Sequence, residues 1–225
     1  MSTVSIAIDG PSGAGKSTLA RSIAASLGYV YVDTGAIYRT IGYEMQAHGI
    51  DLKKEEDVTA RLPQLRVELT YGQDGLQHML VNGEDVTDKI RTPEISLAAS
   101  AVSAYPGVRA YLLDMQRQLA RTQNVVMDGR DIGTVVLPDA TVKIFLTASA
   151  EERARRRMLE LREKGLDEPF EKVLKEIQER DYNDTHRAIA PLRQAEDAVL
   201  LDTTQLNFQE SEEALLRLVR ERTGA

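Results

Sequence analysis

The sequence has no cysteine, and only three of its 225 residues are histidine. The absence of cysteine excludes disulfide bonds and thiolate zinc sites, and it is typical of proteins from a reducing compartment. The histidines, His48, His78 and His186, are scattered along the chain. A histidine-based metal site is therefore not expected.

Long apolar runs are also missing, because no uncharged stretch reaches the roughly 18 residues that a membrane-spanning helix needs. The chain passes from Met1 directly into the apolar residues 4–8, without the basic segment of a secretory signal. Its formal net charge is −7, which does not favour binding to nucleic acid. We therefore expect a soluble, cytoplasmic protein without nucleic-acid or membrane partners. No coiled-coil pattern calls for assembly, so a monomer is expected.

The remaining composition, with 42% apolar and 28% charged residues, is that of a globular protein. Short apolar runs alternate with longer helical patterns, which predicts an α/β fold with a central parallel sheet and helices on its faces. The expected strands are residues 4–9, 29–32, 125–127, 142–146 and 198–201. A helix is expected between the first two strands, ending at Gly28.

Two intervals interrupt this alternation. In 34–106, a β-hairpin is expected with arms at 66–71 and 76–81 and a turn at Gln73-Asp74-Gly75. In 149–165, a helix is expected between Ser149, in capping-box spacing with Glu152, and Gly165. The predicted organisation is one unit whose core comprises 1–33, 107–148 and 166–225, with excursions at 34–106 and 149–165.

Residues 10–17 read GPSGAGKS, which matches the P-loop pattern G-x-x-x-x-G-K-[ST] between a strand and a helix. The glycines allow successive N–H groups to turn toward phosphate oxygens, and the following helix directs its positive end at them. Lys16 is expected to reach the β- and γ-phosphates of ATP, and the Ser17 hydroxyl to ligate Mg²⁺. The predicted ATP-binding residues are Gly10, Pro11, Ser12, Gly13, Ala14, Gly15, Lys16, Ser17 and Thr18.

Switches, motors and kinases all contain this loop. The sequence lacks the N-K-x-D segment of GTP switches and the L-S-G-G-Q segment of ABC-type ATPases. Small-molecule kinases are therefore the favoured class. A kinase of this class must hold two anions together, which requires further arginines. Arg39, Arg130, Arg180 and Arg187 lie near predicted strand ends or helix starts, where the ligands of α/β sheets bind.

The phosphate loop and three segments that contain these arginines resemble the bacterial cytidylate kinase family. The resemblance extends over essentially the whole chain. The four segments read GPSGAGKST, DTGAIYR, DGRDIGTVVLPDA and ERDYNDTHRAIAPL. The resemblance implies a P-loop three-layer fold in which 34–106 is the NMP-binding insertion and 149–165 is a helical lid. It also implies ATP-dependent phosphorylation of CMP and dCMP to CDP and dCDP, with Mg²⁺.

The resemblance assigns roles to individual residues. Arg39, Arg130 and Arg187 are expected to hold the acceptor phosphate, and Arg180 and Asp184 are expected to contact the ribose. From position alone, Arg39 could equally be a surface arginine.

The expected cytosine readers are Ser100, Arg109 and Asp131, with Thr34 near them. An Asp can accept a hydrogen bond from the cytosine amino group, which uracil replaces with a carbonyl. A local ion pair between Arg130 and Asp131 is the alternative interpretation of these two neighbours.

In the lid, Arg153 and Arg157 share one helical face and are expected to cover the donor phosphates, with Arg156 a weaker candidate. The alternative is a solvent-exposed, salt-bridged face, because Glu151–Arg155 and Glu152–Arg156 have i,i+4 spacing. Asp128 ends the strand-like VVMD run, where it could contact Mg²⁺ through water. The catalytic set is thus Lys16, Arg130, Arg187, Arg153 and Arg157.

No general base is needed in such a reaction, because a phosphate monoester with a second pKa near ~6 already presents an anionic oxygen. Two alternatives stay open at the level of the sequence. One is a small-molecule P-loop kinase with a different acceptor, and the other is a nucleotide-dependent switch ATPase.

Overall fold

The computed structural model describes residues 3–73, 75–163 and 165–224. The chain divides into two compact units. Unit 1 comprises Met1–Tyr31 and Ala120–Ala225, and unit 2 comprises Val32–Leu119. The insertion expected at 34–106 falls within the bounds of unit 2.

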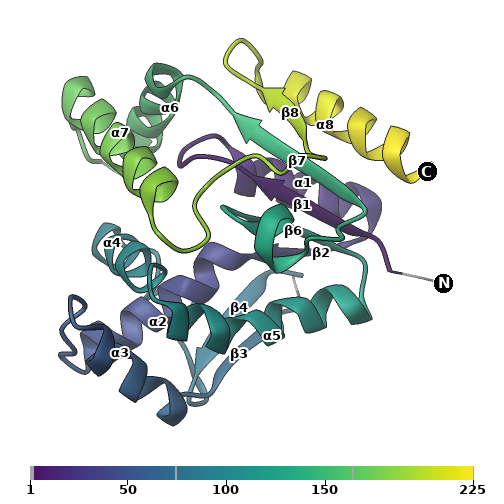
Figure 1. The fold of residues 1–225 in the computed structure, drawn as a ribbon. Helices are drawn as coiled ribbons and strands as arrows, with labels where there is room; N and C mark the ends of the chain where they lie inside the picture. The colour runs from purple at the N-terminus through teal and green to yellow at the C-terminus, as the bar shows by residue number, and fades with distance from the viewer. Residues whose placement is uncertain (1–2, 74, 164, 225) are drawn as a thin grey trace. The chain divides into compact units, whose positions relative to one another are not determined.

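The centre of unit 1 is a parallel sheet (Figure 1). Its strands are β1 (Ser5–Asp9), β2 (Val30–Asp33), β6 (Val125–Gly129), β7 (Val142–Thr147) and β8 (Val199–Asp202), in the order β2-β6-β1-β7-β8. Strand β1 pairs in parallel with β6 on one side and with β7 on the other. All five strands were expected from apolar runs, and each agrees within about two residues. The polar ends of β1 and β6, at Asp9 and Asp128, therefore lie at the same edge of the sheet.

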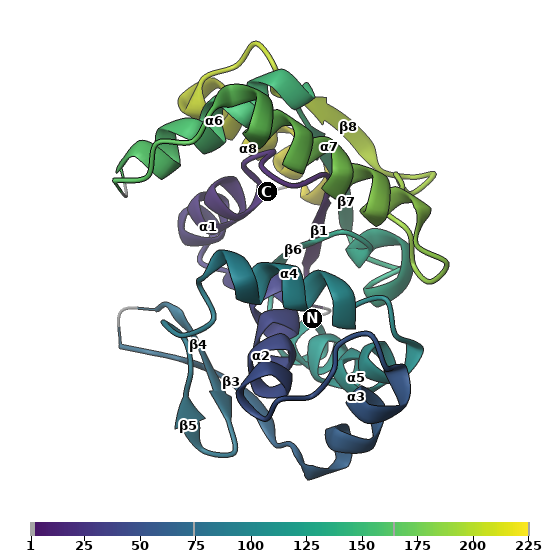
Figure 2. The ribbon, with the colours of Figure 1, turned by 90° about the vertical axis from the view of Figure 1, so that its left-hand side faces the viewer.

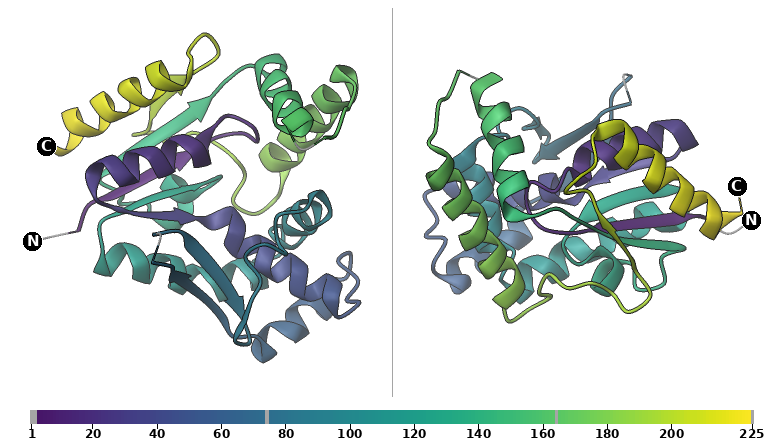
Figure 3. Two further views of the ribbon diagram at one scale, coloured as in Figure 1. Left: turned by 180° about the vertical axis from the view of Figure 1, so that it is seen from behind. Right: turned by 90° about the horizontal axis from the view of Figure 1, so that it is seen from above.

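Helices α1 (Lys16–Leu27) and α8 (Phe208–Thr223) cover one face of this sheet (Figure 3). Their apolar residues form one buried cluster with Ile6, Ile8 and Ile144 of the strands. Leu215 and Val219, from the periodic apolar stripe near the C-terminus, are fully buried in it. Burial of large aliphatic side chains is the main source of folding free energy here, at about 1.5–3 kcal/mol for each.

Helices α6 (Ala150–Glu163) and α7 (Phe170–His186) lie side by side in unit 1 (Figure 2). Ala154, Val173 and Ile177 form a small separate core between them. Helix α6 occupies most of the lid expected at 149–165. Of that segment, Lys164 lies outside the described residues. The Ser149 hydroxyl accepts a hydrogen bond from the Glu152 N–H at 3.2 Å, which confirms Ser149 as the helix cap.

Unit 2 contains α2 (Thr34–Ala47), α3 (Glu55–Arg61), a 3₁₀ turn (Leu62–Gln64), α4 (Pro93–Val102) and most of α5 (Pro106–Thr122). Helices α2 and α4 approach closely at Gly42, where an added Cβ would lie 2.9 Å from the backbone nitrogen of Ala99.

The expected hairpin of unit 2 is confirmed as β3 (Val67–Tyr71) paired antiparallel with β4 (Gln77–Val81). Asp74 of the predicted turn lies outside the described residues, whereas Gly75 has a positive φ of 74°. A third strand, β5 (Glu84–Asp85), was not predicted. It follows a tight turn in which Asn82 and Gly83 both have positive φ, the conformation of a type I′ hairpin turn.

The expected fold class, an α/β P-loop fold with a central parallel sheet and a small antiparallel sheet, is confirmed. Among the described residues, no helix combines the length and the apolar character that crossing a membrane requires.

Candidate active site

The loop between β1 and α1 has the backbone of a phosphate-binding loop. Gly10, Gly13 and Gly15 have φ values of 152°, 73° and 85°, which side chains disfavour. Gly15 is the residue directly before α1, so the first free N–H groups of the helix follow the loop. An anion in the loop would therefore meet both the turned amides and the positive end of the helix.

Gly10 has a second, steric reason to be glycine. A Cβ added there would lie 1.9 Å from the carbonyl oxygen of Leu146 on the neighbouring strand β7. We expect Gly10→Ala to lower the free energy of unfolding by about 3 kcal/mol or more, because backbone on both sides must move. Urea denaturation measures this loss.

Gly28 is the matched control for that substitution. It also has a positive φ, 67°, at the end of α1, but an added Cβ would meet nothing within 4 Å. Gly28→Ala should therefore cost only about 1 kcal/mol, the strain of the left-handed conformation. Equal losses in the two variants would contradict the steric argument at Gly10.

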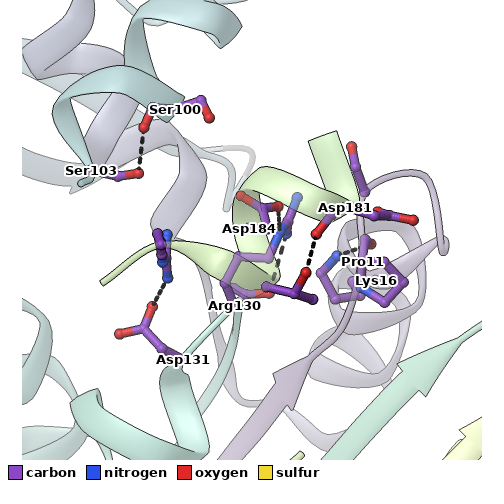
Figure 4. Close-up of polar contacts among 12 residues, drawn as sticks. Pro11, Lys16, Ser100, Ser103, Arg130, Asp131, Asp181 and Asp184 are labelled. Atoms are coloured by element: carbon purple, nitrogen blue, oxygen red, sulfur yellow. Dashed lines mark hydrogen bonds and ion pairs between the residues drawn. The ribbon is translucent and has the colours of Figure 1, made fainter. Parts of the chain in front are cut away.

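Lys16 is buried, with only 5% of its surface exposed. Its Nζ donates a hydrogen bond to the carbonyl oxygen of Pro11 at 2.7 Å (Figure 4). Burial, followed by the positive charge of Arg130, lowers the pKa of Lys16 well below its ordinary value, and Arg180 adds to this effect. Burial and neighbouring positive charge thus disfavour the charged form of Lys16 in the empty loop, and a bound polyanion would favour it.

Ser17 and Asp128 form the part of the site that fits a magnesium ion. The Ser17 hydroxyl donates to Oδ2 of Asp128 at 2.8 Å, and the Tyr31 hydroxyl donates to Oδ1 at 2.8 Å. A P-loop hydroxyl beside a carboxylate at the end of a neighbouring strand is the donor set that P-loop enzymes offer to Mg²⁺. The two residues therefore fit the ion expected from the sequence.

The segments DGRD and ERDYNDTHR are joined by two ion pairs. Arg130 Nε donates to Asp184 Oδ2 at 2.7 Å, and Arg187 Nη2 donates to Asp131 Oδ1 at 3.3 Å (Figure 4). Both carboxylates are more than 90% buried. Each of the two neighbours Arg130 and Asp131 thus has a partner on the other segment.

Asp184 holds its negative charge in this cluster. Burial raises the pKa of its carboxyl, but the cations of Arg130, Arg180 and Arg187 lower it by more, so the net shift is downward. The predicted ribose and phosphate residues of unit 1 are therefore parts of one charged cluster.

Asp9, which sequence analysis did not select, lies at the end of β1. Its Oδ1 accepts from the N–H of Ile132 at 2.8 Å and its Oδ2 from the N–H of Gly133 at 2.7 Å. These residues begin a π-helix, Ile132–Val136, directly after Asp131. Burial raises the pKa of the Asp9 carboxyl from 3.8 to about 6, although both amides lower it.

The raised pKa of Asp9 predicts a pH-dependent stability. Because the folded pKa exceeds the unfolded one, its stabilising contribution is present below pH 3.8 and is lost as the pH rises through about 6. A shift of about two units corresponds to about 3 kcal/mol. The uncharged variant Asp9→Asn should therefore gain free energy of unfolding, relative to the unaltered protein, between about pH 4 and pH 7.

Urea titrations at both pH values measure this difference. Asp202→Asn serves as the control, because hydrogen bonds from Thr204 lower the pKa of the Asp202 carboxyl. That variant should show no such gain over the same interval. A difference between Asp9→Asn and the unaltered protein that stays constant with pH would refute the prediction.

Arg153 of α6 is buried and links the helix to the phosphate loop. Its Nη1 donates to the carbonyl oxygen of Ser12 at 2.9 Å, and its Nε donates to that of Ala148 at 2.9 Å. Its two terminal nitrogens also contact the carboxylate of Asp181 on α7, at 3.1 and 2.6 Å. Asp181 was not singled out from the sequence, since only tertiary packing brings it to Arg153.

The other lid arginines are less buried. Arg157 pairs with Glu160 at 2.9 Å and is partly exposed. Arg156 pairs with Glu152 at 3.0 Å, as its spacing predicted, and it also donates to the carbonyl oxygen of Thr203 at 2.7 Å. Arg155 contacts Glu152, three residues before it, at 3.4 Å.

In unit 2, Asp33 forms ion pairs with two arginines. Its Oδ2 accepts from Arg39 at 2.8 Å and from Arg91 at 2.9 Å, and its Oδ1 accepts from the N–H of Ala36 and caps α2. Burial raises the pKa of the Asp33 carboxyl, but Arg39 and Arg91 outweigh it and lower the pKa. The Arg39 Nε is buried without a hydrogen-bond partner among the described residues. Thr34, the first residue of α2, is buried beside this group.

The predicted base readers of unit 2 lie near one another. Arg109 of α5 donates to the carbonyl oxygen of Ser103 at 3.2 Å. The Ser103 hydroxyl donates to the carbonyl oxygen of Ser100 at 2.9 Å (Figure 4). The Arg109 guanidinium also lies 5.6 Å from the centre of the Tyr38 ring, a cation–π contact. Ser100 and Arg109, nine residues apart in the sequence, are thus parts of one polar group.

A family model described as cytidylate kinase matches residues 6–221 of the chain. The cytidylate kinase of Caldicellulosiruptor bescii is 48% identical over 218 residues, which cover 97% of this chain and 96% of that protein. The cytidylate kinase of Carboxydothermus hydrogenoformans is 50% identical over 214 residues, with coverage of 95% and 96%. Among solved structures, an uncharacterized protein from Eubacterium ventriosum has a TM-score of 0.53 at 10% identity, over 98% of this chain and 100% of that one. That last likeness is one of fold alone.

Proposed function

The chain belongs to the cytidylate kinase family and is a nucleoside monophosphate kinase that phosphorylates CMP and dCMP with ATP, and we propose how its residues carry out this reaction. A kinase with a different acceptor, or a switch ATPase, is not favoured by this membership. The observation that carries the proposal is the buried Lys16 in a glycine loop, with the cations of Arg130 and Arg180 near it.

On the donor side, the loop 10–18 holds the phosphates of ATP through its backbone amides, and Lys16 contacts the β- and γ-phosphates. Mg²⁺, held by Ser17 and through water by Asp128, would supply charge neutralisation to the phosphates when bound. Arg157, which is partly exposed, covers the donor phosphates, and Arg153 does so from its place beside Ser12. Their positive charges stabilise the migrating phosphoryl group.

On the acceptor side, Arg39, Arg130 and Arg187 bind the phosphate of CMP. The position of all three beside buried carboxylates, which orient their guanidinium groups, supports this role. Arg180 and Asp184 contact the ribose. The acceptor phosphate is already anionic at neutral pH, so catalysis is positioning and charge stabilisation with no general base.

The cytosine base is read by Ser100, Arg109 and Asp131, with Thr34 near them. A buried carboxylate such as Asp131 accepts from the amino group that distinguishes cytosine from uracil. The proposal also includes a monomer in the cytoplasm, with small nucleotides as its partners and neither nucleic acid nor membrane among them.

A coupled ADP-release assay tests the proposal. ATP and Mg²⁺ are supplied with CMP, dCMP, UMP, AMP, GMP or no acceptor, in parallel. ADP release concentrated on CMP and dCMP supports both the donor and the acceptor assignments. Release that peaks with another monophosphate refutes the cytosine readers, and release without acceptor refutes the kinase mechanism.

A further inference from the structure

Asp9 occupies a position that the reaction described above does not use. It is the last residue of β1 and directly precedes Gly10, the first residue of the phosphate loop. Only 4% of it is exposed. Each of its carboxylate oxygens accepts one backbone N–H, from Ile132 and from Gly133, at 2.8 and 2.7 Å. The residue therefore joins the phosphate loop to the segment that contains Arg130 and Asp131.

Stability alone does not account for a carboxylate at this position. Burying a charge costs free energy, and the pKa of Asp9 is raised to about 6 for that reason. Asp131 adds to the rise, while Lys16 opposes it. At neutral pH Asp9 is ionised at a cost to the fold. A cost of this kind is expected at positions that serve a function.

The segment that Asp9 contacts is closely packed at Gly133 and is tied down at Asp131. A Cβ on Gly133 would lie 3.1 Å from Cδ of Lys143 and 3.4 Å from Oδ2 of Asp9, so both side chains pack closely against the Cα of Gly133. The preceding Asp131 is paired with Arg187. Loss of one amide bond at Asp9 would free the backbone on which Asp131 is placed.

We propose that Asp9 is a positioning residue for the acceptor nucleotide, which holds Arg130 and Asp131 in the orientation that binds CMP by accepting the N–H groups of Ile132 and Gly133. The inference rests on the proposed function, since it takes Arg130 and Asp131 as acceptor-binding residues. Asp9 itself touches no substrate. Asp9 acts on the acceptor site indirectly, through the backbone at the start of the π-helix.

Asp9→Asn is the variant that tests the proposal, because the amide keeps the size of the side chain but only one acceptor oxygen. Calorimetric titration of CMP and of ATP, each alone, measures the two affinities. We expect the Kd for CMP to rise by about 10-fold or more, and the Kd for ATP to change by less than about 3-fold. The CMP-over-UMP preference in kcat/KM should fall as well.

Two further variants make the test specific. Asp202→Asn removes a strand-end carboxylate that likewise accepts a backbone N–H, from Thr204 at 2.8 Å, and it should leave both affinities unchanged. Gly133→Ala adds a methyl group against Lys143 and Asp9, so it displaces the same segment and should weaken the affinity for CMP more than that for ATP. If Asp9→Asn does not fold, Gly133→Ala still tests the proposal.

The outcomes are separable. An unchanged Kd for CMP in Asp9→Asn, while the unaltered protein binds and phosphorylates CMP, overturns the inference alone. A parallel loss of CMP and ATP affinity together with a lower unfolding temperature also overturns it, because this is the result of a structural role. Failure of the unaltered protein to bind or phosphorylate CMP refutes the proposed function itself.

Discussion

Lys16→Ala should lower kcat by at least about 100-fold, because removal of one preorganised charge at the reacting phosphates has this effect in other enzymes. The variant should nevertheless fold. Burial and the neighbouring Arg130 lower the pKa of Lys16, so its charged form is a cost to the empty fold. The coupled ADP-release assay with saturating ATP and CMP measures kcat, and thermal unfolding checks the fold.

Lys175→Ala is the matched control for Lys16→Ala. Lys175 lies on the surface of α7, where it pairs with Glu179 at 3.7 Å, and such exposed pairs contribute only ~0–1 kcal/mol. Its kcat should equal that of the unaltered protein. Turnover of well-folded Lys16→Ala within a few-fold of normal would exclude the P-loop mechanism proposed here.

Asp131→Ala should reduce the preference for CMP over UMP by about 100-fold or more, because a site that hydrogen-bonds a substrate amino group rejects the analogue that lacks it. The substitution also removes a partner of Arg187, which is proposed to bind the acceptor phosphate. The loss of that partner should weaken the binding of CMP and of UMP equally, since both have the same phosphate. The ratio of the two kcat/KM values therefore isolates the effect on the base.

Asp139→Ala provides the control, since Asp139 is an exposed carboxylate eight residues further along the same segment. It should keep the full preference for CMP. If Asp131→Ala lowers activity on CMP and UMP by the same factor, Asp131 is not a cytosine reader, and the contact with Arg187 is its role.

The parallel strands were predictable because each buries a short apolar run and ends at a polar residue or glycine. The β3–β4 hairpin was predictable for the same reason. The short strand β5 was missed, although Asn82-Gly83 before it is a strong turn signal that could have revealed it. Its two residues are exposed, so the strand has no apolar pattern by which to be recognised.

The sequence by itself determined the phosphate loop, because the conformations of its glycines and the start of α1 depend on residues close together in the chain. It also determined which arginines and carboxylates were candidates. Only the tertiary structure decided how they pair. Arg130 contacts Asp184, 54 residues away, and Asp9 accepts from Ile132, 123 residues away. Such pairs depend on the order of strands in the sheet, which brings Asp9 beside the end of β6. No local pattern encodes that neighbourhood, so the sequence could not reveal the place of Asp9.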